Sequence, residues 1–195
     1  MSRSLRALVL LMLLASCAGG GSSKAPRNLD NACAILDERR GYFRALKASE
    51  RKWGVPVAVQ MATIYQESKF ISDARTPFRY KLGVIPVGRQ SSAFGYSQAL
   101  DGTWREYQQQ EGSFRSRRDN IRHATEFMGW YMSKSNQELG IPLTDATNQY
   151  LAYHDGRTGY RRGSYRSKPW LMRVANEVGD RSVMYHQQLK TCRRV

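Results

Sequence analysis

Glu67 ends a stretch of residues suited to a buried helix. The segment from Val55 to Tyr65 is apolar almost all round, which is typical of a helix enclosed in a protein core. A carboxyl group on the rim of such a helix loses hydration, and this raises its pKa. Cleavage of a glycosidic bond needs an acid that is still protonated near pH 7. Glu67 is therefore a candidate catalytic acid, although a glutamate at a helix end is more often a solvated charge.

Three short motifs follow one another in a suggestive order. They are Glu67-Ser68, Gly95-Tyr96-Ser97-Gln98 and Ala152-Tyr153-His154, and Gly54-Val55-Pro56 opens the helix before the first. This order resembles the soluble lytic transglycosylase domain, a lysozyme-like fold with Glu-Ser, Gly-Leu-Met-Gln and Ala-Tyr-Asn motifs. The resemblance covers roughly residues 50–160. It implies a mainly α, lysozyme-like helical domain with at most a small β-hairpin insertion.

The sequence departs from the family pattern within two of the motifs. Tyr96 and Ser97 stand where the family has Leu and Met, and His154 stands where it has Asn. The contacts that the family makes through Asn are therefore not carried over to His154 directly. These differences indicate a divergent branch of the family.

The resemblance also assigns roles to individual residues. It implies that Glu67 is the sole acid and base, that Gln98 contacts the sugar, and that Tyr153 directs its hydroxyl toward Glu67. An amide can bridge sugar hydroxyls or an acetamido group, and a phenol both stacks and hydrogen-bonds. The alternatives are a surface amide at Gln98 and a core aromatic at Tyr153. Four further motif residues are taken as substrate-binding too: Ser68, Gly95, Tyr96 and His154.

A second carboxylate would decide between two mechanisms, because most glycosidases use a pair. Asp73 and Asp101 are the nearest candidates, but each lies in a sequence typical of a turn. A single carboxyl suits a lytic transglycosylase, which cleaves peptidoglycan between N-acetylmuramic acid and N-acetylglucosamine and leaves a 1,6-anhydro end. The alternatives are a hydrolytic muramidase on the same fold and a lipoprotein that binds peptidoglycan without cutting it.

No metal or other cofactor is expected. His123, His154 and His186 are scattered, whereas zinc sites usually gather ligands at short spacings.

The N-terminus predicts export and lipid attachment. Arg3 and Arg6 precede an apolar stretch that is too short to span a bilayer, so residues 1–16 are expected to be a signal peptide. Leu14-Ala15-Ser16-Cys17 looks like a lipobox, which predicts lipidation of Cys17. Residues 17–28 would then be the lipidated cysteine and a flexible tether, and residues 29–195 the enzymatic domain. The alternative is an ordinary signal peptide with a chance cysteine.

The net charge of the chain and its expected export limit the kinds of binding partner that it can have. The chain has a net charge of +15, which favours polyanions, but export argues against nucleic acid. The expected partners are peptidoglycan glycan strands, whose stem peptides carry carboxylates, and a membrane bound through the lipid anchor. Ala18 after the cysteine suggests the periplasmic face of the outer membrane, by analogy with other lipoproteins.

The remaining residues predict elements around the motifs. Cys33 and Cys192 are expected to form a disulfide in an oxidising compartment, with two free thiols as the alternative. Two short helices are expected between residues 29 and 46, broken at Gly41, and Trp104 and Trp130 are expected in the core. Further expectations are a hairpin at 82–87, helices capped by Asp119 and Thr144, a basic loop at 156–168 that suits a substrate groove, and a last helix from Pro169.

Overall fold

The computed structural model describes residues 22–192, so the expected signal peptide and Cys17 lie outside the described residues. The described part is mainly helical, with one small hairpin, and so confirms the predicted fold class. The elements in order are α2 (Ala32–Glu38), α3 (Tyr42–Trp53), α4 (Val57–Ser68), β1 (Phe78–Lys81), β2 (Ile85–Arg89), α5 (Asp101–Gln110), α6 (Ile121–Leu139), α7 (Ala146–Arg162), the 3-10 turn η1 (Ser164–Ser167) and α8 (Pro169–Leu189).

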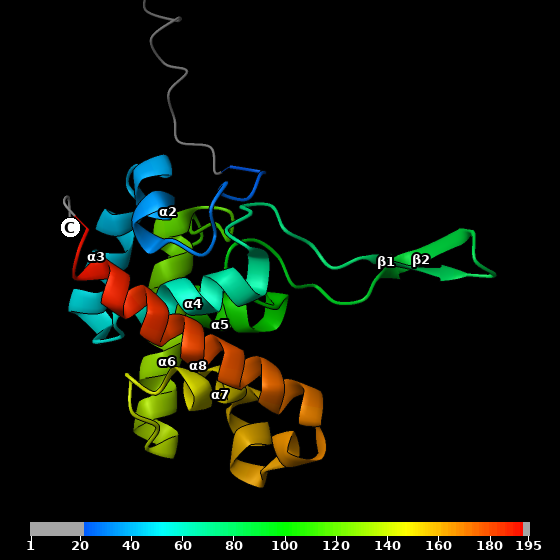
Figure 1. Ribbon diagram of the computed structural model, residues 1–195. Coiled ribbons are helices and arrows are strands. Elements are labelled where there is room, and N and C mark those ends of the chain that lie inside the picture. The colour runs from blue at the N-terminus through cyan, green and yellow to red at the C-terminus, as the bar shows by residue number, and fades with distance from the viewer. Residues whose placement is uncertain (1–21, 193–195) are drawn as a thin grey trace, which may run out of the picture.

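Helix α4 lies in the middle of the fold. It begins directly after Pro56, and nine of its twelve residues are buried, as its apolar sequence predicts. Helix α8 crosses it, and α7 packs against α8 beneath them (Figure 1). Because α4 is enclosed by other helices, its C-terminal residues keep a defined position.

An aromatic cluster fills the space between α5 and α6. Trp104 and Phe127 have ring centroids 5.3 Å apart, and Tyr107 lies 5.6 Å from Trp130. All four are buried, which confirms the prediction that Trp104 and Trp130 belong to the core. Phe127 also lies 6.4 Å from the ring of Tyr153, so the cluster extends to α7.

Two predicted helix caps are wrong by one residue. Asn120, not Asp119, caps α6 by accepting from the amides of Arg122 and His123, because the Asp119 carboxylate is bound to Arg117. Asp145, not Thr144, caps α7. A neighbouring polar residue with free side-chain oxygens displaced the predicted cap in each case.

The predicted basic loop at 156–168 is also wrong. Helix α7 continues to Arg162 through a kink at Gly156, where φ is +76° and ψ 153°, and η1 follows. The Asp155 carboxylate accepts a hydrogen bond from Ser164 and pairs with Lys168, which draws η1 back onto the kinked helix. Tertiary pairing has therefore ordered a segment whose glycines and arginines predict a loop.

The hairpin is longer than predicted and projects from the helical body. Strands β1 and β2 pair antiparallel on either side of Leu82–Val84, and the hairpin extends away from the helices as an arm (Figure 1). Every residue of β1 is exposed, and so is every residue of β2 except Arg89, which is half-buried.

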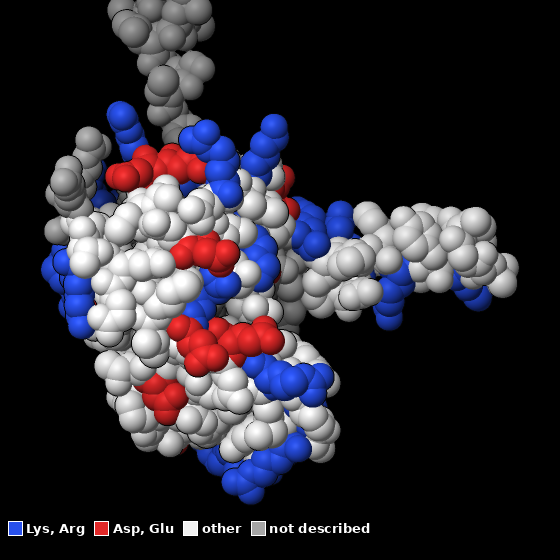
Figure 2. All heavy atoms as spheres, viewed as in Figure 1, with Lys and Arg blue, Asp and Glu red and all other residues white. Residues whose placement is uncertain are grey.

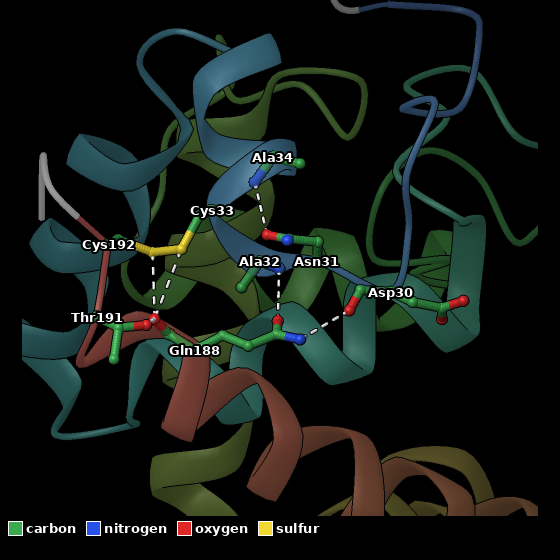
Figure 3. The surroundings of a disulfide bond; sticks show 8 residues. All are labelled: Asp30, Asn31, Ala32, Cys33, Ala34, Gln188, Thr191 and Cys192. Atoms are coloured by element: carbon green, nitrogen blue, oxygen red, sulfur yellow. Dashed lines mark hydrogen bonds between the residues drawn. A yellow bond between two sulfur atoms is a disulfide. The ribbon is translucent and has the colours of Figure 1, made fainter.

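The predicted disulfide between Cys33 and Cys192 is present. The two Cα atoms are 5.6 Å apart, and the bond joins α2 to the end of α8 (Figure 3). Gln188 reinforces the junction, since its amide oxygen accepts from the Ala32 N–H at 2.7 Å and its amide nitrogen donates to the Asp30 carbonyl at 2.8 Å. The two ends of the described chain are thereby held together.

Candidate active site

A cleft of about 470 Å³ lies where the end of α4 meets α7, a size typical of ligand-binding pockets. It receives Glu67 from α4, Gln98 from the irregular segment after the arm, and Tyr153 and His154 from α7. Each of the three motifs therefore contributes a lining residue. The other lining residues are Thr76, Ser91, Ala93, Ala99, Leu100, Thr103, Phe127, Tyr131, Asp155 and Gly156.

Glu67 has the electrostatic environment that its sequence context predicts. Loss of hydration raises the pKa of its carboxyl to about 7, while a hydrogen bond from Tyr150 and the charge of Lys69 both act to lower it. Desolvation dominates, so a substantial fraction of the group is protonated at neutral pH. Such a group can both donate and accept a proton near pH 7.

Tyr150 is the residue of this site that sequence reasoning missed. Its side chain is buried, and burial together with the charge of Glu67 raises the pKa of the phenol. It stands three residues before Tyr153 on α7, so both tyrosines lie on one face of the helix. The three-residue spacing from Tyr153 was the feature of the sequence that could have identified Tyr150. Tyr150 stabilises the ionised form of Glu67.

Tyr153 lines the cleft and is held in place by the second motif. Its hydroxyl donates to the Ser97 carbonyl at 2.6 Å. Burial raises the pKa of this phenol, with the charge of Glu67 as the next cause, which indicates that the ring lies near Glu67. The hydrogen bond ties α7 to the segment that contains Gln98.

Gln98 lines the cleft with a constrained side chain. Its backbone has a φ of +46°, and its amide nitrogen donates to the carbonyls of Ala74 at 2.9 Å and Gly95 at 2.8 Å. Among the described residues no donor contacts its amide oxygen within hydrogen-bonding distance. The oxygen is therefore the part of Gln98 that is open to a ligand.

Ser68, Gly95 and Tyr96 lie outside the cleft, in the structure that supports it. Ser68 donates to the Tyr96 carbonyl at 2.9 Å, and the Tyr96 side chain is buried with its hydroxyl 2.6 Å from that of Tyr42. At Gly95, a Cβ would come within 2.2 Å of the Arg118 carbonyl oxygen. The structure thus places these three predicted substrate contacts where they join α4 to the second motif.

Glu67 is the one carboxyl that lines the cleft without forming a salt bridge among the described residues. Asp73 is exposed and outside the cleft, and Asp101 pairs with Arg118 at 2.7 Å. Asp155 does line the cleft, but its carboxylate is engaged by Lys168 and Ser164. The second carboxylate that a paired mechanism needs is not available in this arrangement.

His154 stands at the rim of the cleft. Its side chain is exposed to solvent, and its ring lies 5.2 Å from that of Trp170, edge to face. Burial of part of the ring lowers its pKa, so it is largely neutral at pH 7. Within residues 22–192 it joins no group of three or more residues able to hold a metal ion.

The family model described as the transglycosylase SLT domain matches residues 5–192. The match extends well beyond the residues 50–160 that carry the motifs and includes both cysteines of the disulfide. No curated protein matches the sequence. Since the family model spans nearly the whole chain, this protein belongs to the transglycosylase SLT domain family.

Proposed function

We propose that the protein is a membrane-anchored lytic transglycosylase that cleaves peptidoglycan without water. Membership of the family suggests lytic transglycosylase activity on peptidoglycan. The bond cleaved would be the β-1,4 bond between N-acetylmuramic acid and N-acetylglucosamine, and the new end a 1,6-anhydro sugar. Glu67 would serve first as acid and then as base.

The proposed reaction uses one carboxyl group twice. Protonated Glu67 donates its proton to the glycosidic oxygen, the bond from that oxygen to C1 of the muramic acid breaks, and the acetamido oxygen of the sugar stabilises C1. The Glu67 carboxylate then takes the proton of the C6 hydroxyl while O6 forms a bond to C1. Glu67 ends protonated as it began, and no water is consumed.

The observation that carries this proposal is that, within residues 22–192, Glu67 is the one carboxyl lining the cleft that forms no salt bridge. A pKa of about 7 keeps Glu67 partly protonated for the first step and leaves its carboxylate basic enough for the second. A hydrolytic muramidase would need a second group to position water, and Asp155 is held by Lys168 and Ser164. A protein that only bound glycan would gain nothing from the cost of burying a carboxyl group.

Anchoring through a lipid on Cys17 belongs to the same proposal. It is supported by the lipobox-like sequence before that residue. No helix within residues 22–192 is long and apolar enough to cross a bilayer. Attachment at the periplasmic face of the outer membrane would bring the cleft within reach of the cell wall.

Replacing Glu67 by Gln tests the proposal. The amide keeps the shape of the side chain but cannot donate the proton, so turnover of purified peptidoglycan should fall by at least about 10²-fold. Glu177→Gln, which changes an exposed carboxyl on α8 outside the cleft, is the matched control and should keep its activity. Circular dichroism would show that both variants fold.

The products of the unmodified protein separate the rival reactions by mass spectrometry. Sugar ends one water lighter than the hydrolysed form are expected for a transglycosylase. Reducing muramic acid ends would instead establish a muramidase. A folded Glu67→Gln variant that digests peptidoglycan at the normal rate would exclude the mechanism.

A further inference from the structure

The arm formed by residues 76–91 has no role in the proposed reaction beyond its root, where Thr76 and Ser91 line the cleft. Its strands form a two-stranded sheet with no third strand. Such a hairpin is marginally stable in water unless something packs on it. Its sequence and exposure therefore call for an explanation.

The arm exposes apolar side chains along its length and most strongly at its tip. Leu82 is 83% exposed and Val84 75%, and Ile85 and Val87 are each about half exposed. Of the eleven large apolar residues exposed in the described chain, six lie in the arm: Phe78, Tyr80, Leu82, Val84, Ile85 and Val87. Such a concentration marks an interaction surface, in contrast to single exposed apolar residues, which are common.

All charged residues of the arm are basic. Arg79 and Lys81 lie in β1 just before the tip, whereas Arg89 lies at the root of the arm and donates to the Thr76 carbonyl at 2.7 Å. None of the three forms a salt bridge within the described residues. No acidic residue occurs between Asp73 and Asp101. On the face seen in Figure 2 the arm carries basic groups and no acidic ones. An apolar tip backed by aromatic and basic residues is the arrangement that enters a lipid headgroup layer.

Ser22, the first residue that the structure describes, lies close in the fold to the start of the arm. The Ser72 N–H donates to the Ser22 carbonyl at 2.9 Å, only four residues before the arm starts. Cys17 is five residues further back, a distance of at most about 18 Å along an extended chain. The arm itself reaches roughly 20 Å from its root, so the proposed anchor and the tip can meet the same membrane.

We propose that the arm inserts its tip into the surface of an anionic lipid bilayer. Leu82, Val84 and Ile85 would enter the acyl boundary, while Arg79 and Lys81 contact lipid phosphates. Glycan is a poor occupant, because aliphatic side chains offer no hydrogen bonds to sugar hydroxyls. A second copy of the arm is disfavoured because the two basic surfaces would repel each other.

Vesicle binding without the lipid anchor tests the proposal. The chain from residue 17 with Cys17→Ser keeps the entire core, which lies between Ala32 and Tyr185. It should sediment with vesicles of phosphatidylethanolamine and phosphatidylglycerol, less so in high salt, and weakly with phosphatidylcholine vesicles. Leu82→Ser with Val84→Ser should weaken binding by at least about tenfold. Phe114→Ser with Val183→Ser removes equally exposed apolar residues elsewhere and should not.

A second pair of variants distinguishes the contribution of the basic residues in the arm from that of the protein's overall positive charge. Arg79→Gln with Lys81→Gln should weaken binding to anionic vesicles by roughly tenfold or more. Arg162→Gln with Arg173→Gln, two exposed arginines far along the chain, should have a smaller effect. All arm variants should digest peptidoglycan normally. Vesicle binding is measured without reference to enzyme activity, so the test remains valid even if the proposed function is wrong.

Two outcomes would overturn the proposal. One is that arm and control variants bind vesicles alike, which would make binding a matter of total charge. The other is that the unmodified arm binds neither kind of vesicle, which would assign its apolar surface to a protein partner.

Discussion

Glu67 has a proton-binding behaviour that links chemistry to stability. Its folded-state pKa of about 7 lies above its ordinary value of 4.5, so between these pH values the folded protein binds more protons at this site than the unfolded chain. The stability due to the protonated group is therefore fully present below pH 4.5. It is lost as the pH rises through 7, where the ionised carboxylate remains poorly hydrated.

Glu67→Gln should consequently stabilise the protein at alkaline pH. The amide cannot ionise, so at pH 8 the variant should exceed the unmodified protein in free energy of unfolding, by up to about 3 kcal/mol. The difference should disappear near pH 4. Urea unfolding at the two pH values measures it. Equal stabilities at pH 8 would contradict the raised pKa.

Tyr150 should control the pH range of activity. Its hydroxyl favours the ionised form of Glu67, so Tyr150→Phe should raise the pKa of that carboxyl further. The alkaline limb of kcat/KM against pH reports the acid, and it should move to higher pH. Tyr160→Phe is the control, because the Tyr160 hydroxyl donates a hydrogen bond to the Asn148 side chain. A limb that stays in place or moves to lower pH would refute the role assigned to Tyr150.

At the scale of elements, the end of α4 and the segment around Gly95 behave as one unit. Ser68 bonds the Tyr96 carbonyl across 28 residues of sequence, and Tyr153 bonds the neighbouring Ser97 carbonyl. Lys69, Phe70 and Gln98, which lie around this junction, all have positive φ. Such backbone strain persists only where the surrounding structure enforces it, and it often marks functional sites.

Gly95→Ala should disrupt this junction. A Cβ at this position would meet backbone atoms of Arg118 and would also be strained at a φ of +79°. The expected loss in free energy of unfolding is about 3 kcal/mol or more. Gly140→Ala is the control, because its φ is +69° but its surroundings are open, and it should cost about 1 kcal/mol. Equal losses in the two variants would show that crowding against Arg118 is unimportant.

At the scale of the whole molecule, the disulfide unites the ends of the folded body. Cys33 and Cys192 are 159 residues apart, so the bond closes almost the entire described chain into one loop. The family match includes both cysteines.

Replacing both cysteines by Ala should destabilise the protein without altering the cleft. Loss of a disulfide that closes a loop of this length should reduce the free energy of unfolding by roughly 3–5 kcal/mol. Chemical unfolding of the double variant measures the loss, and activity below the transition should be retained. A change of less than about 1 kcal/mol would mean that Gln188 and the packing of α2 on α8 suffice.

The sequence alone determined those features that depend on local pattern. The apolar run before Glu67 predicts a buried helix because almost every face of that segment is apolar. Gly41 separates α2 from α3 as expected, and the left-handed Gly54 ends α3. The cysteines could be paired by counting. Glu67 could be chosen because hydration is lost wherever a carboxyl follows so apolar a helix.

Only the tertiary structure decided which side chains reach the cleft. Tyr96 is withdrawn into the core by Tyr42, Asp155 is neutralised by Lys168, and Tyr150 meets Glu67. Each outcome depends on a partner well separated in sequence, so no local pattern reveals it. The same reason explains why residues 156–168 became ordered while the apolar hairpin stayed exposed: burial is set by what the rest of the chain packs against a segment, and hydrophobic pattern alone does not report it.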